Sequence, residues 1–125
     1  MKFYPESVEE FMHELSIAQN IVKIVNQEYE KGEYSEKVKF VYFSAGKMNA
    51  IIPESLQLNF NIVKLKYKEL ADSTLVIEEK AVIIQCQNCE VEVEINEPDF
   101  SCQNCGSTDI KIVQGKDMFV DSFEV

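Results

Sequence analysis

Four cysteines carry the clearest chemistry in the sequence. They form two CQNC tetrapeptides with twelve residues between them: Cys86, Cys89, Cys102 and Cys105. Two residues between cysteines let one tight turn direct both sulfurs toward a common point, and two such turns supply the four thiolates that close a structural zinc site. A segment this short buries little apolar area, so we expect the metal to contribute its folding free energy. The spacing therefore predicts a structural zinc site and argues against a catalytic one.

Other chemistries for the same cysteines are weaker. Two disulfides would suit a secreted chain, but the opening residues, MKFYPESVEEF, are acidic and lack the apolar stretch of a signal peptide. A redox CxxC pair normally stands alone. Zinc ribbons often bind nucleic acid, yet from Lys80 to Lys116 three lysines face six acidic residues. A tetrathiolate zinc adds further negative charge, so we expect no nucleic-acid binding.

The second candidate metal ligand is His13, the only histidine, in the segment Met12-His13-Glu14. On the residues alone, a solvent-facing helix position is the simpler interpretation of this histidine. A ligand role is the alternative.

Composition narrows the function classes. The chain has 125 residues, a hydrophobic fraction of 46% and a formal net charge of −10, and its twelve basic residues are all lysine. These values indicate a folded domain that suits cations or basic surfaces better than phosphates. No apolar run is long enough to span a membrane, so we expect no membrane contact and a cytoplasmic location. With one histidine, a saturated metal site and no phosphate loop, an enzyme is the least expected class.

The hydrophobic periodicity predicts two helices and three strands. One helix should begin at the Ser7–Glu10 capping box and end before Gly32. Another should begin at Pro53, and strands are expected at 38–44, 73–85 (long, or broken near Glu79) and 117–125. The expected core face of the first helix comprises Val8, Phe11, Leu15, Ala18, Val22, Val25 and Tyr29. That of the second comprises Leu56, Phe60, Val63, Tyr67 and Leu70.

Lys64, Lys66 and Lys68 cluster toward the end of the second predicted helix. They can be a solvated helix end, favoured by the helix dipole, or a docking patch for an acidic partner. Because the apolar patterns on both sides of the cysteines resemble each other, we interpret the cysteine segment as an insertion in an α/β domain.

Four segments occur in an order that resembles one known family. They are MHELSIAQNIVKIV, AGKMNAIIPESLQLNF, the paired CxxC motifs and IVQGKDMFVDSFEV, and together they resemble HypA, the hydrogenase nickel incorporation family, over residues 12–125. The resemblance implies an α/β (α+β type) fold, in which a small three-stranded sheet packs against two helices and carries an inserted zinc-ribbon domain. The implied nickel-binding domain is 1–84 plus 113–125, the zinc domain is 85–112, and residues 1–11 are an atypical N-terminal extension.

The resemblance also implies a function. Members are metallochaperones that deliver Ni(II) during maturation of [NiFe]-hydrogenase, and in some organisms of urease. They work with a HypB-type GTPase and the hydrogenase large subunit. Carried over by motif, the zinc ligands are the four cysteines and the nickel site is Met12, His13 and Glu14. The sequence leaves open whether the protein is a monomer or a homodimer.

This chain departs from the family at the nickel motif, which normally opens the protein. A free amine, deprotonated amides and an imidazole suit square-planar Ni(II). Here eleven residues precede Met12, whose nitrogen would then be a peptide nitrogen. Met12 can be the true start, or the extension can be removed by processing. If it is retained, His13 and Glu14 would bind nickel through their side chains, or the protein would be a zinc-stabilised adaptor in metalloenzyme assembly that carries no nickel.

Overall fold

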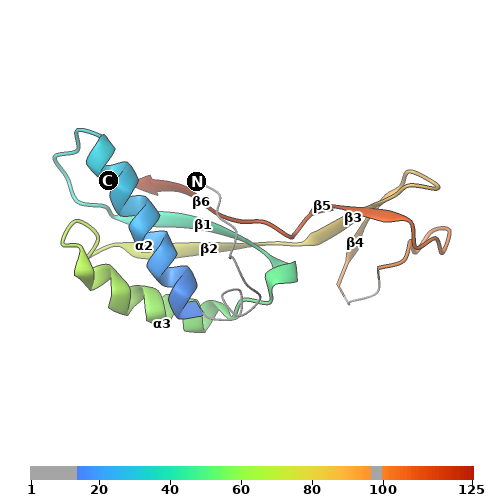
Figure 1. Ribbon diagram of the computed structural model, residues 1–125, viewed down its shortest axis with the longest axis horizontal. Helices are drawn as coiled ribbons and strands as arrows, with labels where there is room; N and C mark the ends of the chain where they lie inside the picture. The colour runs from blue at the N-terminus through green and yellow to red at the C-terminus, as the bar shows by residue number, and fades with distance from the viewer. Residues whose placement is uncertain (1–13, 97–99) are drawn as a thin grey trace.

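The computed structural model describes residues 14–96 and 100–125 (Figure 1). The predicted helix start at Ser7, and the candidate ligands Met12 and His13, lie outside these ranges. The helices are α2 (Glu14–Lys31) and α3 (Pro53–Val63). The strands, in chain order, are β1 (Phe40–Gly46), β2 (Thr74–Lys80), β3 (Val82–Cys86), β4 (Glu92–Ile95), β5 (Ile110–Gln114) and β6 (Met118–Glu124).

The larger sheet has the order β2-β1-β6 and is covered on one face by both helices (Figure 1). Strand β1 runs parallel to β2 and antiparallel to β6. Helix α3 makes the crossover that a parallel pair requires, since two parallel strands cannot be joined by a tight turn. The predicted α+β fold, with a three-stranded sheet against two helices, is confirmed.

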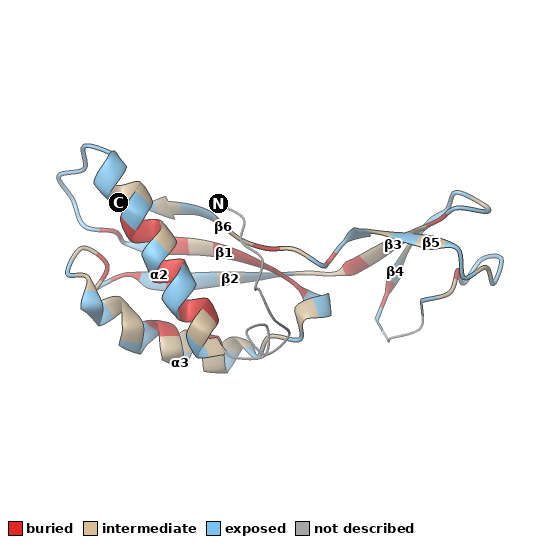
Figure 2. Ribbon diagram, in the orientation of Figure 1, coloured by how far each residue is buried: buried red, intermediate tan, exposed pale blue. Residues whose placement is uncertain are grey.

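The core lies between the helices and the central strand β1. Helix α2 contributes Ile17, Ala18, Ile21, Val22 and Val25, all almost completely buried (Figure 2). The prediction that Leu15 belongs to this face was wrong, because that side chain is 47% exposed. The buried stripe is centred on Ile21 and Val25, and Leu15 lies at its edge in the first described turn.

Helix α3 begins at Pro53, as predicted, because proline has the right φ and needs no hydrogen-bond acceptor at that position. Leu56 and Phe60 are buried, and the helix tightens into a 3-10 turn from Lys64 to Lys66. Lys64 Nζ donates to the carbonyl of Ser73 at 2.7 Å and lies over the Phe60 ring. Lys64 therefore joins α3 to the start of β2, which neither interpretation of the lysine cluster anticipated.

A second sheet, of order β4-β3-β5, extends from one end of the first (Figure 1). Only Ala81 separates β2 from β3, close to the predicted break near Glu79. The second sheet runs from Val82 to Gln114, so its strands begin and end slightly outside the predicted bounds 85–112. The division into two domains stays a prediction.

The end of β1 meets the chain that returns from the second sheet at backbone level. Gly46 N donates to Asp117 O at 2.8 Å, and Met48 N donates to Gly115 O at 3.0 Å. A Cβ on Gly46 would overlap the Gly115 carbonyl. Glycine at position 46 therefore allows the end of β1 to touch the segment that returns from the second sheet.

Candidate metal centre

The four cysteines lie in two turns of the same backbone geometry, at the far end of the second sheet. We define them as the first cysteine turn (residues 86–91) and the second cysteine turn (residues 102–107). In the first, Glu90 N donates to Cys86 O at 2.9 Å and Cys86 N to Val91 O at 3.0 Å. In the second, Gly106 N donates to Cys102 O at 2.7 Å and Cys102 N to Ser107 O at 2.8 Å. The repeated CQNC sequence thus folds twice into the same turn.

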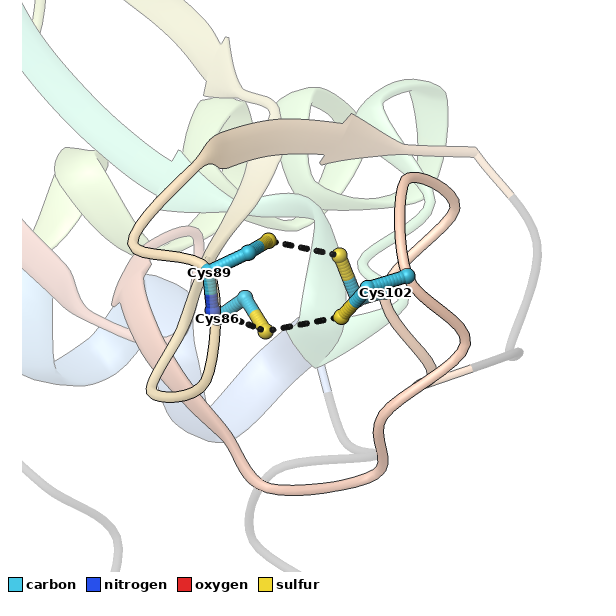
Figure 3. A group of neighbouring side chains, drawn as sticks. Cys86, Cys89 and Cys102 are labelled. Atoms are coloured by element: carbon cyan, nitrogen blue, oxygen red, sulfur yellow. Dashed lines mark hydrogen bonds between the residues drawn. The ribbon is translucent and has the colours of Figure 1, made fainter.

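The two cysteine turns bring all four sulfurs together. Cys86 Sγ lies 3.5 Å from Cys105 Sγ. Cys89 Sγ lies 3.6 Å from Cys102 Sγ (Figure 3). All four sulfurs lie within 4.8 Å of one another. In a zinc tetrahedron with bonds of about 2.3 Å, sulfurs are about 3.8 Å apart, so the donor set fits zinc. A disulfide would need about 2.05 Å, so the four cysteines are free thiols or thiolates and not two bridges.

Exposure differs between the two members of each CxxC pair. Cys86 and Cys102 are buried, whereas Cys89 is half-buried and Cys105 is exposed. The strands β3 and β4 of the same sheet bury a small apolar cluster formed by Val82, Ile84 and Ile95. With four sulfur donors the coordination sphere of a zinc ion would be closed, which makes the site structural.

Among the described residues, amide hydrogen bonds reach the sulfurs of Cys86, Cys89 and Cys105. Cys86 Sγ accepts from the backbone N–H groups of Asn88 and Cys89, each at 3.4 Å. The Asn88 side chain donates to Cys105 Sγ at 3.7 Å, and the Asn104 side chain donates to Cys89 Sγ at 3.5 Å. The bond from Asn104, followed by that from the backbone of Val91, lowers the pKa of the Cys89 thiol to about 6. The sequence did not predict that Asn88 and Asn104 contact the sulfurs, although both asparagines recur in the two CQNC tetrapeptides.

Of the predicted nickel ligands, only Glu14 lies within the described residues. It is in the first described turn of α2, and its Oε1 accepts a hydrogen bond from Ile52 N at 3.2 Å. Ile52 is the N-cap residue of α3. The Glu14 carboxylate thus connects the start of α2 to the loop that precedes α3. Glu14 is close to Met12 and His13 because the three residues are consecutive in the sequence.

The chain is similar to known proteins over almost its whole length. Residues 12–125 match the family model described as hydrogenase/urease nickel incorporation, metallochaperone, HypA. The hydrogenase maturation factor HypA of Desulfatibacillum aliphaticivorans is 40% identical over 114 residues, which cover 91% of this chain and 87% of that protein. The HypA of Desulfosudis oleivorans is 37% identical, with 91% and 98% covered.

Solved structures share the fold. The solution structure of the nickel metallochaperone HypA from Helicobacter pylori aligns with a TM-score of 0.65 at 24% identity and covers 90% of this chain and 97% of that one. A second solution structure of a HypA protein aligns with a TM-score of 0.68 at 23% identity. Within the described ranges, no helix combines the length and apolar character needed to cross a membrane.

Proposed function

The chain belongs to the HypA family of hydrogenase and urease nickel-incorporation metallochaperones, and we propose that it carries Ni(II) in the segment Met12-His13-Glu14, with Met12 and His13 as nitrogen donors and Glu14 as the residue that positions them. The observation that supports this most strongly is the extent of the family match, which begins at Met12 and runs through both cysteine turns to the last residue. The four-cysteine cluster supports a structural zinc site beside the nickel function. The family is one of maturation factors, and the proposed action is non-catalytic.

The proposed nickel site combines nitrogen donors with an anchored carboxylate. Ni(II) favours planar nitrogen donors, which the His13 imidazole and the backbone nitrogens of Met12 and His13 can offer. The Glu14 carboxylate already accepts a hydrogen bond from Ile52 N. We therefore assign its side chain to holding the start of α2 against the loop before α3, with nickel bound by the nitrogens that precede it.

A role in hydrogenase maturation implies interaction with the maturation machinery. The finer assignment is a proposal: a HypB-type GTPase and the hydrogenase large subunit are the expected partners, with urease maturation proteins as a further class. We place this exchange in the cytoplasm, because nickel insertion precedes the finished enzyme. The net charge of −10 supports protein and cation partners over nucleic acid.

The test is a calorimetric nickel titration of zinc-loaded protein in two forms, residues 1–125 and 12–125, each with and without His13→Ala. We expect one nickel per chain, bound more tightly by the 12–125 form, because its Met12 supplies an amine that loses its proton far more readily than a peptide nitrogen. His13→Ala should abolish stoichiometric binding in both forms. If neither form binds one equivalent, or if His13→Ala binds as well as its parent, the nickel site is refuted and the adaptor function is favoured.

Glu14 requires its own pair of variants. Glu14→Gln retains an oxygen that can accept from Ile52 N, whereas Glu14→Ala removes it. We expect Glu14→Gln to retain nickel binding and Glu14→Ala to weaken it, since only the second releases the loop. Loss of nickel in Glu14→Gln equal to that in His13→Ala would instead make the carboxylate a nickel ligand.

A further inference from the structure

We propose that Asn88 and Asn104 form a reciprocal clamp across the zinc site, which sets how tightly the metal is held at its two accessible sulfurs. Each asparagine projects from its own cysteine turn and donates a side-chain N–H to a sulfur of the other turn. Asn88 reaches Cys105 Sγ at 3.7 Å, and Asn104 reaches Cys89 Sγ at 3.5 Å. We call this pair of contacts the asparagine clamp.

The symmetry of the two cysteine turns makes the clamp reciprocal. Both turns close with the same two backbone hydrogen bonds, so the third residue of each CQNC takes the equivalent position. From that position Asn88 contacts the fourth residue of the opposite tetrapeptide, and Asn104 does the same in the other direction. A contact on one turn alone would be incidental, but equivalent contacts in both directions follow from the repeated sequence and fold.

The clamp acts on the sulfurs that most need support. Cys86 and Cys102 are buried, and Cys86 Sγ also accepts two backbone N–H groups. Cys89 is half-buried and Cys105 is exposed, so a chelator, a competing thiol or an electrophile meets these two sulfurs first. The asparagine side chains therefore contact the two positions at which ligand exchange would begin.

The charge of the segment explains why neutral donors are suited to this task. Four thiolates on one divalent zinc leave a charge of −2, and acidic residues outnumber lysines six to three from Lys80 to Lys116. Hydrogen bonds from amides reduce the negative charge on sulfur without adding a cation. Groups that hydrogen-bond to metal ligands typically change metal affinity by about 10- to 100-fold when they are mutated.

The experiment compares Asn88→Ala and Asn104→Ala with Gln87→Ala and Gln103→Ala in the zinc-loaded full chain. The glutamines are matched controls, because they are exposed neighbours in the same tetrapeptides and the Gln87 amide donates to Gln85 O instead of to sulfur. We measure zinc affinity by chelator competition and the rate of zinc release to excess chelator. Each asparagine variant should lose about 10-fold in affinity and release zinc faster, whereas the glutamine variants should match the parent.

Asn88→Asp and Asn104→Asp distinguish hydrogen bonding from packing. They preserve side-chain shape but replace the donating amide with a carboxylate that repels thiolate, so they should lose more affinity than the alanine variants. The second readout is cobalt-substituted protein, in which the sulfur-to-cobalt charge-transfer band should shift in the asparagine variants and not in the glutamine variants. That band responds to the charge that sulfur donates to the metal, and the glutamine variants control for general changes in the two cysteine turns.

Two results would overturn the clamp. One is zinc affinity and band energy in the asparagine variants equal to those in the glutamine variants. The other is aspartate variants that hold zinc as well as the parent protein, which would reduce the contact to packing.

Discussion

Glu90 and Gly106 occupy the same position in the two cysteine turns but differ in the free-energy cost of their backbone conformation. Each donates its N–H to the carbonyl of the first cysteine of its turn. Each also has a left-handed backbone, with φ of 63° at Glu90 and 78° at Gly106. Glycine adopts this conformation without penalty, whereas a residue with a Cβ is disfavoured there by roughly 1–2 kcal/mol. The first turn therefore stores strain that the second does not.

Glu90→Gly should relieve that strain. Glycine also raises the conformational entropy of the unfolded chain, which lowers the unfolding free energy by about 0.4–1 kcal/mol and offsets part of the relief. We therefore expect a net gain of about 0.5–1 kcal/mol in the unfolding free energy of the zinc-loaded protein. Gly106→Ala should lose about 1 kcal/mol by the reverse argument, since a Cβ there meets nothing within 4 Å and only the backbone is strained. Denaturant unfolding measures both. Glu90→Gln, which removes charge and keeps the Cβ, is the control, and a gain in that variant equal to the gain in Glu90→Gly would refute the backbone explanation.

At this scale, the sequence allowed prediction of the four-cysteine cluster but not of the groups that contact its sulfurs. The cysteines could be identified because CxxC spacing is a local constraint that one turn satisfies. The contacts of Asn88 with Cys105 and of Glu14 with Ile52 join residues far apart in the chain. Such contacts depend on how turns and helices pack, which residue type alone does not specify.

At the scale of elements, the strand predicted at 117–125 is present as β6, but its buried side chains do not alternate along its whole length. Met118 and Val120 are buried, whereas Ser122 is exposed and Phe123 packs on the core. The pairing register with β1 shifts between Tyr42 and Phe43. A bulge of this kind adds one residue to a strand and so reverses which side chains face the core beyond it. No residue type in the segment 121–125 predicts the extra residue.

The junction after β1 offers two substitutions in one turn with opposite expected effects. A Cβ on Gly46 would overlap the Gly115 carbonyl and lie 2.8 Å from Lys116 N, and these are backbone atoms that cannot rotate away. Gly46→Ala should therefore lower the unfolding free energy by about 1–3 kcal/mol, as overpacking does. Ala50 has φ of 52°, so Ala50→Gly should be neutral or stabilising by up to about 1 kcal/mol.

Thermal and denaturant unfolding of the two variants checks this pair. Both substitutions exchange alanine and glycine close to the same junction, so general effects of glycine on the unfolded chain are of similar size in each. If Gly46→Ala unfolds like the parent protein, the close approach of the end of β1 to the returning segment at Gly115 does not restrict position 46.

At the scale of the whole molecule, the two sheets are supported by cores of very different size. The larger sheet and its helices enclose an extensive buried cluster that includes Phe43, Phe60 and Met118. Among the described residues of the second sheet, the buried apolar cluster comprises Val82, Ile84 and Ile95, and Cys86 and Cys102 are also buried. Apolar patterning predicted the larger core because it repeats along two helices and three strands. It predicted a strand at 73–85, long or broken near Glu79, but not that its second part, β3, belongs to another sheet, since a strand that passes from one sheet into another keeps the same alternation.

This asymmetry predicts the effect of removing zinc. The small apolar cluster cannot compensate for the conformational entropy of ordering residues 82–114, so the zinc–sulfur bonds must supply most of that free energy. Chelation should therefore unfold β3, β4 and β5 while the larger sheet and its helices remain folded. Native-state hydrogen exchange measures this directly: amides of β3, such as Ile84, should lose protection on chelation, whereas those of β1, such as Val41 and Phe43, should retain it.

The matched control is Cys86→Ala, which should show the chelated pattern even with zinc present, because three thiolates leave the coordination sphere open.

The junction between the two sheets determines how far the unfolding spreads. Gly46 N and Met48 N bond to the returning chain at Asp117 and Gly115. If those bonds hold, protection should end abruptly between Val82 and Ala81 on one crossing and near Gly115 on the other. Loss of protection throughout β1 and β6 would contradict this, and would mean that zinc stabilises the whole protein as one cooperative unit.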